Sequence, residues 1–325
     1  MNEELQLRLH GDASLPTLIY LPGLHGDWTL IPSFRLALAG RVRFVEFTYP
    51  RTLTWSLDDY ADAIEAALLE QGITRGWLLG ESFGSQIVWP LLAHSSAGRV
   101  PQGPALEGGS QSGTRGARPP ESSGGRGSSR APFDPGGRGT PPSQAVFRAN
   151  GVILAGGFVK HPLKWGVYAA GKFCHGVSLT WLTRLLFFYA KFARFRHRQA
   201  SETLASIQEF VARRTELDKQ AAVHRLRLVA ANDPRGLARQ VRLPVYQLSG
   251  LFDPVVPWPF VRPWLKRHCP GYRGSRVIGM ADHNVLGTAP KGAAEQVMQW
   301  LQGARLANQS GGEPQVKPEL GSWNG

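Results

Sequence analysis

Trp77-Leu78-Leu79-Gly80-Glu81-Ser82-Phe83-Gly84-Ser85-Gln86-Ile87-Val88 is the stretch of sequence on which the fold depends. An apolar run ends at Gly80, Ser82 follows, and an apolar run with helical character begins after Gly84. This order of strand, sharp turn and helix is that of the nucleophile elbow, G-x-S-x-G. A serine on so tight a turn has strained backbone, and side chains in place of the two glycines would collide with the strand and the helix. The turn lifts the serine hydroxyl above the sheet edge and places the N–H groups of a helix N-terminus behind it.

The composition bounds the size of the fold and the classes of partner. The chain has 325 residues, of which 42% are apolar, so it can bury the core of one large α/β domain or of two smaller ones. The formal net charge of +13 raises nucleic acid and an anionic membrane as partners. Much of this charge lies in a Gly/Arg/Pro/Ser tract and in one mid-chain segment, which favours a merely basic surface.

The cysteines and the N-terminus indicate the compartment. Cys174 and Cys269 fit no metal-binding or CxxC spacing, so we expect free thiols, no metal and no cofactor. Met1-Asn2-Glu3-Glu4 is acidic and does not have the pattern of a signal peptide. No apolar window is long enough to cross a membrane, and we therefore expect a cytoplasmic protein. The sequence does not indicate an oligomeric state.

Apolar runs of strand length alternate with helical patterns along the chain. The alternation of Leu5, Leu7 and Leu9 with polar residues predicts an edge strand. Continuous apolar runs predict further strands at 17–21, 42–47, 151–155, 243–250 and 275–279, in addition to the strand of the elbow. The alternation predicts an α/β fold in which a mostly parallel central sheet is flanked by helices.

Two local signals concern the helices around the elbow. Ser56-Leu57-Asp58-Asp59 has the pattern of a capping box, which predicts a helix that ends near Gly72. Pro90 falls inside the helix that follows the elbow, and a proline there should kink or shorten it.

The middle of the chain changes character twice. A tract rich in Gly, Ser, Pro and Arg cannot bury enough apolar surface to offset its ordering entropy, so we interpret it as a disordered insertion within one domain. The segment after it is helical, aromatic and basic, which predicts a cap over the active site that packs on the core or touches a membrane surface. The interpreted organisation is a core of 1–96, 145–157 (one strand) and 241–303, an insertion at 97–144, a helical cap at 158–240 and a disordered tail at 304–325.

Three predicted strands end in residues that act together in acyl-transfer chemistry. In open parallel sheets ligands bind beyond the carboxyl ends of the strands, where this chain offers Ser82, Asp253 and His283 in that order. A serine hydroxyl becomes a nucleophile when an imidazole takes its proton, and a carboxylate orients the imidazole. The order Ser, Asp, His is the one expected of this architecture.

Other residues compete for these roles. Asp282 adjoins His283 in sequence and is badly placed to reach its ring, and Asp233 has the pattern of a turn residue. The Gly-rich turn 22–27 follows a buried strand, so its N–H groups could approach a ligand, although a plain strand-to-helix turn has the same pattern. His25 in this turn has two interpretations, a hydrogen bond to substrate or a structural role. The remaining histidines are interpreted as surface or packing residues.

The chain resembles the α/β-hydrolase fold family of serine hydrolases with a helical cap. The resemblance spans residues 5–303 without the insertion, and four motifs carry it: Leu21-Pro22-Gly23-Leu24-His25-Gly26, Gly80-Glu81-Ser82-Phe83-Gly84, Gly250-Leu251-Phe252-Asp253-Pro254-Val255-Val256-Pro257 and Asp282-His283-Asn284. Pro90 and the insertion depart from the family pattern.

The resemblance implies a role for each matching residue. It implies Ser82 as nucleophile, His283 as general base and then acid, Asp253 as the orienting acid, and the backbone N–H groups of Leu24 and Phe83 as the oxyanion hole. Dehalogenases and epoxide hydrolases of this fold have aspartate at the elbow, so Ser82 implies acyl transfer.

Two functions follow from these observations. The first is hydrolysis of a small carboxylic ester or related acyl substrate, mostly apolar, through an acyl-enzyme; ester, thioester, lipid and a perhydrolase side reaction stay open. The second is a non-catalytic, hydrolase-like protein that binds anionic lipid or nucleic acid, which the net charge and the Arg/Gly tract favour. The complete set of Ser82, Asp253 and His283 favours the enzyme.

Overall fold

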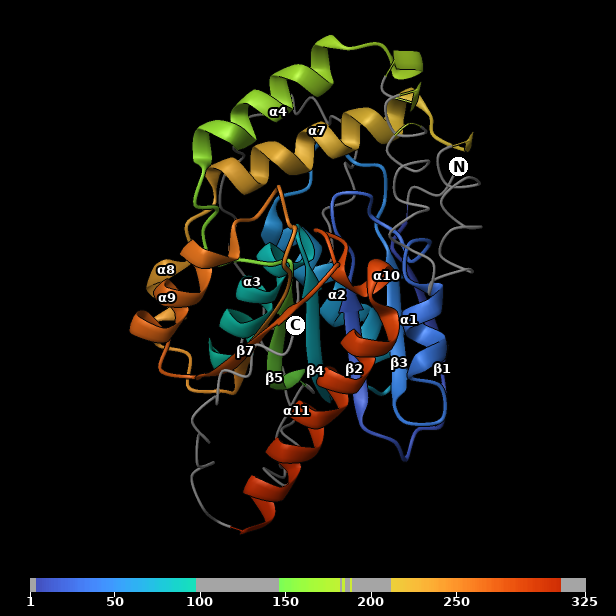
Figure 1. Cartoon of the computed structure of the whole chain (residues 1–325). Helices are drawn as coiled ribbons and strands as arrows, with labels where there is room; N and C mark the ends of the chain where they lie inside the picture. The colour runs from blue at the N-terminus through green and yellow to red at the C-terminus, as the bar shows by residue number, and fades with distance from the viewer. Residues whose placement is uncertain (1–3, 98–145, 182, 185–187, 189–211, 311–325) are drawn as a thin grey trace, which may run out of the picture.

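A computed structural model describes residues 4–97, 146–181, 183–184, 188 and 212–310 (Figure 1). Its strands form one seven-stranded sheet in the order β1-β3-β2-β4-β5-β6-β7. β1 pairs antiparallel with β3, and every other neighbouring pair is parallel. The strands are β1 (Gln6–His10), β2 (Thr17–Leu21), β3 (Arg43–Thr48), β4 (Arg75–Glu81), β5 (Arg148–Ala155), β6 (Val245–Gly250) and β7 (Tyr272–Ile278).

Helices cover both faces of this sheet. They are α1 (Pro32–Ala37), α2 (Leu57–Glu70), α3 (Gly84–Ala97), α4 (Lys164–Gly176), α7 (Glu216–Ala231), α8 (Arg235–Ala238), α9 (Trp258–His268), α10 (Val285–Thr288) and α11 (Pro290–Ser310). The architecture confirms the predicted α/β fold with a mostly parallel sheet flanked by helices. Among the described helices, none combines the length and the apolar character needed to cross a membrane.

The alternation of side chains along the strands divides the core into two layers. Successive strand residues point to opposite faces, so neighbours such as Leu18 and Ile19 belong to different apolar clusters. Ile19 packs in the cluster that contains residues of α2 and α3, while Leu18 packs in the cluster that contains residues of α1, α10 and α11. Both side chains are fully buried, as expected of a central strand.

The start and the end of α2 follow the sequence signals. The Ser56 side chain accepts from the Asp59 N–H, and the Asp59 carboxylate accepts from the Ser56 N–H, so the predicted capping box is confirmed. The helix ends at Glu70, and Gly72 follows with φ +67°.

Pro90 was expected to kink or shorten the elbow helix; the shortening is wrong, and the kink stays a prediction. α3 runs from Gly84 to Ala97 with Pro90 inside it. A proline in a helix interior costs about 3 kcal/mol. The flanking side chains of α3 are almost completely buried in the core, and this burial offsets the cost: Ile87, Val88, Trp89, Leu91 and Leu92.

Three parts of the predicted organisation fall partly or wholly outside the described residues. α3 ends at Ala97 and β5 begins at Arg148, so nearly all of the predicted insertion, with residues 98–145, lies outside them. In the predicted cap, α4 packs on α7, while the interval 189–211 is not described. The expected tail from 304 needs a correction, because α11 continues to Ser310 and buries Ala304; residues 311–325 lie outside the described part.

Candidate active site

Ser82 occupies the turn between β4 and α3 in left-handed backbone. Its φ is +47°, a strained conformation for a residue other than glycine. The two glycines of the motif permit close approach on either side. A Cβ on Gly80 would lie 2.8 Å from Cα of Ser85, and one on Gly84 would lie 2.0 Å from the carbonyl oxygen of Leu21. Any larger residue would therefore push the turn away from its neighbours.

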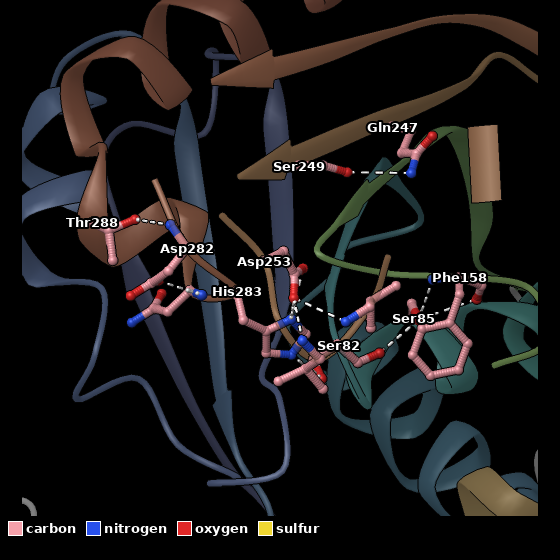
Figure 2. A network of polar contacts seen from close by, with 12 residues as sticks. Ser82, Ser85, Phe158, Gln247, Ser249, Asp253, Asp282, His283 and Thr288 are labelled. Atoms are coloured by element: carbon pink, nitrogen blue, oxygen red, sulfur yellow. Dashed lines mark hydrogen bonds and ion pairs between the residues drawn. The ribbon is translucent and has the colours of Figure 1, made fainter. Parts of the chain in front are cut away.

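The structure brings Ser82, His283 and Asp253 together in one chain of hydrogen bonds (Figure 2). The Oγ of Ser82 lies 2.8 Å from Nε2 of His283. The other ring nitrogen, Nδ1, lies 2.9 Å from Oδ2 and 3.1 Å from Oδ1 of Asp253. An imidazole held in this way can accept a proton from the hydroxyl, and the carboxylate stabilises the charged ring that results.

The surroundings of His283 bias it toward the charged form. Burial lowers its pKa, but the hydrogen bond and the negative charge of Asp253 outweigh burial, and the pKa is raised above 6.5. The nearby carboxylates of Glu81 and Asp282 act in the same direction.

Backbone hydrogen bonds fix the loop of Asp253 against the loop of His283. Leu251 N–H donates to the carbonyl of Ile278, and Phe252 N–H donates to the carbonyl of Ala281. Oδ1 of Asp253 accepts from the N–H groups of Val255 and Val256 at 2.9 and 2.8 Å. The carboxylate is therefore held by its own loop while it faces His283.

A second network holds the elbow from behind. Oγ of Ser85 donates to the carbonyl of Ser82 at 2.6 Å and accepts from the N–H of Phe158 at 3.2 Å (Figure 2). The side-chain amide of Gln86 donates to the Phe158 carbonyl at 2.9 Å and accepts from Asn232 at 3.0 Å. The loop after β5 and the end of α7 therefore both support the turn that carries Ser82.

The turn after β2 lies directly beside Ser82. A Cβ on Gly23 would lie 3.4 Å from Cβ of Ser82. The Gly23 carbonyl accepts from the Gly26 N–H at 3.0 Å, and because the peptide is planar and trans, the Leu24 N–H points the opposite way. Phe83 is fully buried, with its ring packed edge-on against Tyr60. Within the described part of the chain, neither the Leu24 nor the Phe83 N–H donates to another backbone group.

Arg225 of α7 holds the same turn, and sequence reasoning missed it. Its side chain is buried and donates to the carbonyls of Leu24 and Pro50 at 2.9 and 3.0 Å. A Cβ on Gly26 would lie 2.4 Å from Nη1 of Arg225, so the guanidinium packs against the bare backbone of the turn. In the sequence, Arg225 is visible only as an arginine among the apolar positions of a helix. That pattern does not predict a contact with Leu24, which lies 201 positions away in the chain.

Glu81, the variable residue of the elbow motif, is a second feature that the sequence did not indicate. Its carboxylate is buried and accepts from the hydroxyl of Tyr20. Burial raises the pKa of Tyr20, and the charge of Glu81 raises it further. His25 lies nearby, with its Nε2 3.8 Å from Oε2 of Glu81.

The competing acids lie apart from the His283 ring nitrogens. Asp282 is buried and accepts from the N–H of Asn284 at 3.0 Å. Asp233 pairs with Lys160 and Arg235, and these partners hold the pKa of its carboxyl well below the usual range. Asp253 is therefore the carboxylate that the fold brings to the imidazole.

A polar cavity adjoins the turn after β2. Its volume is about 170 Å³, and Leu24 and His25 form one wall. Thr29 and Ala222 also line it, and the rest of the lining is charged: Asp27, Arg51, Arg213, Arg214 and Asp218. Over the described residues, no group of three His, Cys, Asp or Glu side chains could hold a metal ion.

The comparisons with known proteins identify the fold. No protein-family model matches the sequence, and no curated protein matches it either. Several solved structures share the fold. An α/β hydrolase from a Medee basin deep-sea metagenome is 12% identical, with a TM-score of 0.62 over 92% of this chain and 94% of that one. A thermophilic esterase from Thermogutta terrifontis is 15% identical, with a TM-score of 0.58 over 92% and 93%. The enol-lactonase from Burkholderia xenovorans is 14% identical, with a TM-score of 0.62 over 92% and 96%.

These similarities show that the chain has the α/β-hydrolase fold. They extend over nearly the whole length of each compared chain, with identities too low to transfer an activity.

Proposed function

We propose that this protein is a serine hydrolase that cleaves a carboxylic ester or a related acyl substrate through an acyl-enzyme intermediate. The observation that carries the proposal is the hydrogen-bond chain from Ser82 through His283 to Asp253, set on a strained turn between a strand and a helix. Solved structures of the same fold include an esterase and an enol-lactonase, which act on bonds of this kind.

The reaction begins with a proton transfer along the hydrogen bond between Ser82 and His283. As Oγ of Ser82 attacks the substrate carbonyl carbon, Nε2 of His283 takes the hydroxyl proton, and Asp253 stabilises the imidazolium. The tetrahedral intermediate collapses when the bond to the leaving alkoxide breaks and His283 returns the proton to that oxygen. Water then attacks the acyl-enzyme by the same route, which releases the acid and restores Ser82.

Charge that develops on the carbonyl oxygen needs donors beside Ser82. We assign this role to the N–H groups of Leu24 and Phe83, the first in the turn next to Ser82 and the second immediately after it. Loss of one such donor costs roughly 100- to 1000-fold in rate. Arg225 is a positioning residue in this scheme, because it holds the Leu24 carbonyl from the cap.

The substrate is defined less closely than the reaction. The sequence predicts an apolar acyl group, whereas the cavity next to Leu24 and His25 has a charged lining. We infer that one end of the substrate is polar where it meets this cavity, and we assign contact with that end to His25, which lines the cavity.

Labelling with a fluorophosphonate tests the proposal. We expect the wild-type protein to be labelled and Ser82→Ala to be unlabelled, with at least a thousandfold loss of p-nitrophenyl ester hydrolysis. Ser14→Ala, a serine in an exposed turn, is the matched control and should behave as wild type. A folded wild-type protein that is not labelled would contradict the proposal and would favour a non-catalytic binding protein.

A further inference from the structure

The outermost helix of the cap exposes a row of aromatic side chains. α4 lies outside α7 at the top of Figure 1, so α7 separates it from the sheet. The exposed fractions are 72% for Trp165, 52% for Tyr168 and 54% for Phe173, and 65% for Trp181 just beyond the helix. Single exposed aromatics are ordinary, but a group of this kind on one outer surface indicates an interaction site.

One side of α4 packs on the protein and the other faces outward, as in a helix that lies at a membrane interface. Trp165, Lys172 and Phe173 are seven and eight residues apart and share one side of α4. Val167, on the opposite side, is buried in the main apolar cluster, and α4 packs there against α7. The packing of the cap on the core therefore uses one side of α4 and leaves the aromatic side outward.

The charge of this surface identifies its partner. From His161 to Arg184 the sequence contains three Lys and Arg residues and no Asp or Glu. Lys164, Lys172 and Arg184 are exposed beside the aromatic side chains. Tryptophan next to lysine and arginine is the composition of helices that lie in the headgroup region of anionic membranes.

Two other partners, a second copy of the protein and nucleic acid, fit this surface less well. Two copies of the protein that met through this surface would bring like charges together. Nucleic acid would need a row of cations to follow its phosphates, whereas the outward side of α4 between Trp165 and Phe173 has Lys172 as its one cation.

We propose that the outer cap surface, defined by Trp165, Tyr168, Lys172, Phe173 and Trp181, docks the protein on a bilayer rich in anionic phospholipid. The aromatic rings enter the headgroup region, and the basic side chains contact the lipid phosphates. The cap contacts the turn beside Ser82 through Arg225, so docking brings that end of the molecule to the membrane. If the proposed esterase activity is correct, this placement gives the enzyme access to acyl substrates that partition into the bilayer.

Co-sedimentation of the full-length protein with vesicles tests the proposal. We expect binding to vesicles of phosphatidylcholine with 30% phosphatidylglycerol, weak binding to pure phosphatidylcholine, and weakening by salt. The double variant Trp165→Ala/Trp181→Ala should bind at least tenfold more weakly, and Lys172→Glu should weaken binding to the anionic vesicles selectively. Leu36→Ala is the matched control, because Leu36 is an apolar residue of α1 with 53% exposure, and α1 packs against α10 and α11 outside this surface.

Three results would overturn the proposal. They are failure of the wild-type protein to bind anionic vesicles, undiminished binding by the double tryptophan variant, and a dimer in solution that this variant dissociates. Binding of single-stranded RNA in place of vesicles would assign the surface to nucleic acid instead. Vesicle binding by Ser82→Ala separates this proposal from the enzymatic one, because loss of the nucleophile leaves the surface intact.

Discussion

Two histidines in this protein face carboxylates in almost the same way but differ in what their second ring nitrogen meets. At the carboxyl ends of the strands, Nδ1 of His283 lies 2.9 Å from Asp253. Between α2 and α3, Nδ1 of His94 lies 3.2 Å from Oε2 of Glu65. The hydrogen bond to the carboxylate raises the pKa of His94, and the same interaction raises that of His283 against the effect of burial.

The second ring nitrogen distinguishes the two pairs. Nε2 of His283 meets the hydroxyl of Ser82 at 2.8 Å, and the His283 side chain keeps 23% exposure. Nε2 of His94 is buried, with Asp58 Oδ1 3.9 Å away. Glu65 also accepts from the N–H of Phe147, so this pair ties the end of α3 to the chain that enters β5. A histidine–carboxylate pair can move protons for a reaction only where its outer nitrogen reaches a reacting group.

The largest difference between the pairs should appear in Asp253→Asn. The amide oxygen of the new side chain can still accept from the N–H groups of Val255 and Val256, so the loop should keep its form while His283 loses the negative partner. We expect turnover of p-nitrophenyl esters to fall roughly 10⁴-fold, with little change in the melting temperature. Asp282→Asn, the neighbouring rival acid, is the control and should lose less than about tenfold. An Asp253→Asn enzyme within tenfold of wild type would remove Asp253 from the mechanism.

The opposite pattern is expected of His94→Leu, with lost stability and unchanged turnover at low temperature. The substitution leaves the buried carboxylate of Glu65 without its histidine, which should cost about 3 kcal/mol in the free energy of unfolding. Urea denaturation measures this cost, and the double variant His94→Leu/Glu65→Leu should recover part of it because no buried carboxylate remains. Unchanged stability in the single variant would show that the pair contributes nothing to the fold.

The pH dependence sharpens the comparison. The base must be neutral, so kcat/KM should rise with pH through a pKa above 6.5, because the His283 pKa is raised. The stability from a histidine with a raised folded-state pKa is complete below 6.5 and is lost as pH rises through the raised value. Activity should therefore increase while the free energy of unfolding decreases over the same range.

Both histidines contribute to that loss of stability, and variants separate them. His94→Gln should reduce the slope of unfolding free energy against pH and leave the activity inflection in place. Measuring both profiles on one preparation tests this. A shift of the activity inflection in His94→Gln would couple the two pairs and contradict their independence.

The contrast also shows what a sequence can predict about this fold. The apolar runs, the alternation of Leu5, Leu7 and Leu9, and the elbow glycines are local, and they predicted the strands around Ser82. Ser82, Asp253 and His283 lie together, as the elbow motif, the strand ends and the residue order predicted; their catalytic roles stay a prediction.

The remaining contacts depend on packing between distant segments, which no local pattern contains. Arg225 reaches Leu24 from α7, and Glu65 of α2 contacts both His94 and Phe147. At Pro90 the local pattern was misleading: proline disfavours a helix, but the burial of the flanking side chains stabilises α3 through this position. The polar lining of the cavity beside His25 likewise arises from side chains that only the packed cap brings together.

The smallest effect is expected of Asp58→Asn, which removes the most distant of the three carboxylates near His94; Glu65 and Asp62 lie 3.2 and 3.4 Å from Nδ1. The Asp58 side chain is 66% exposed and its Oδ1 lies 3.9 Å from Nε2, so solvent screens the interaction. The loss in unfolding free energy should be no more than about 1 kcal/mol, and part of it reflects the first turn of α2, where an acidic residue favours the helix dipole. Comparison with His94→Leu in urea separates the buried partner from the exposed one. If Asp58→Asn were as damaging as His94→Leu, the exposed carboxylate would be the one that holds His94, and the buried pair with Glu65 would no longer explain why α3 and the entry to β5 stay joined.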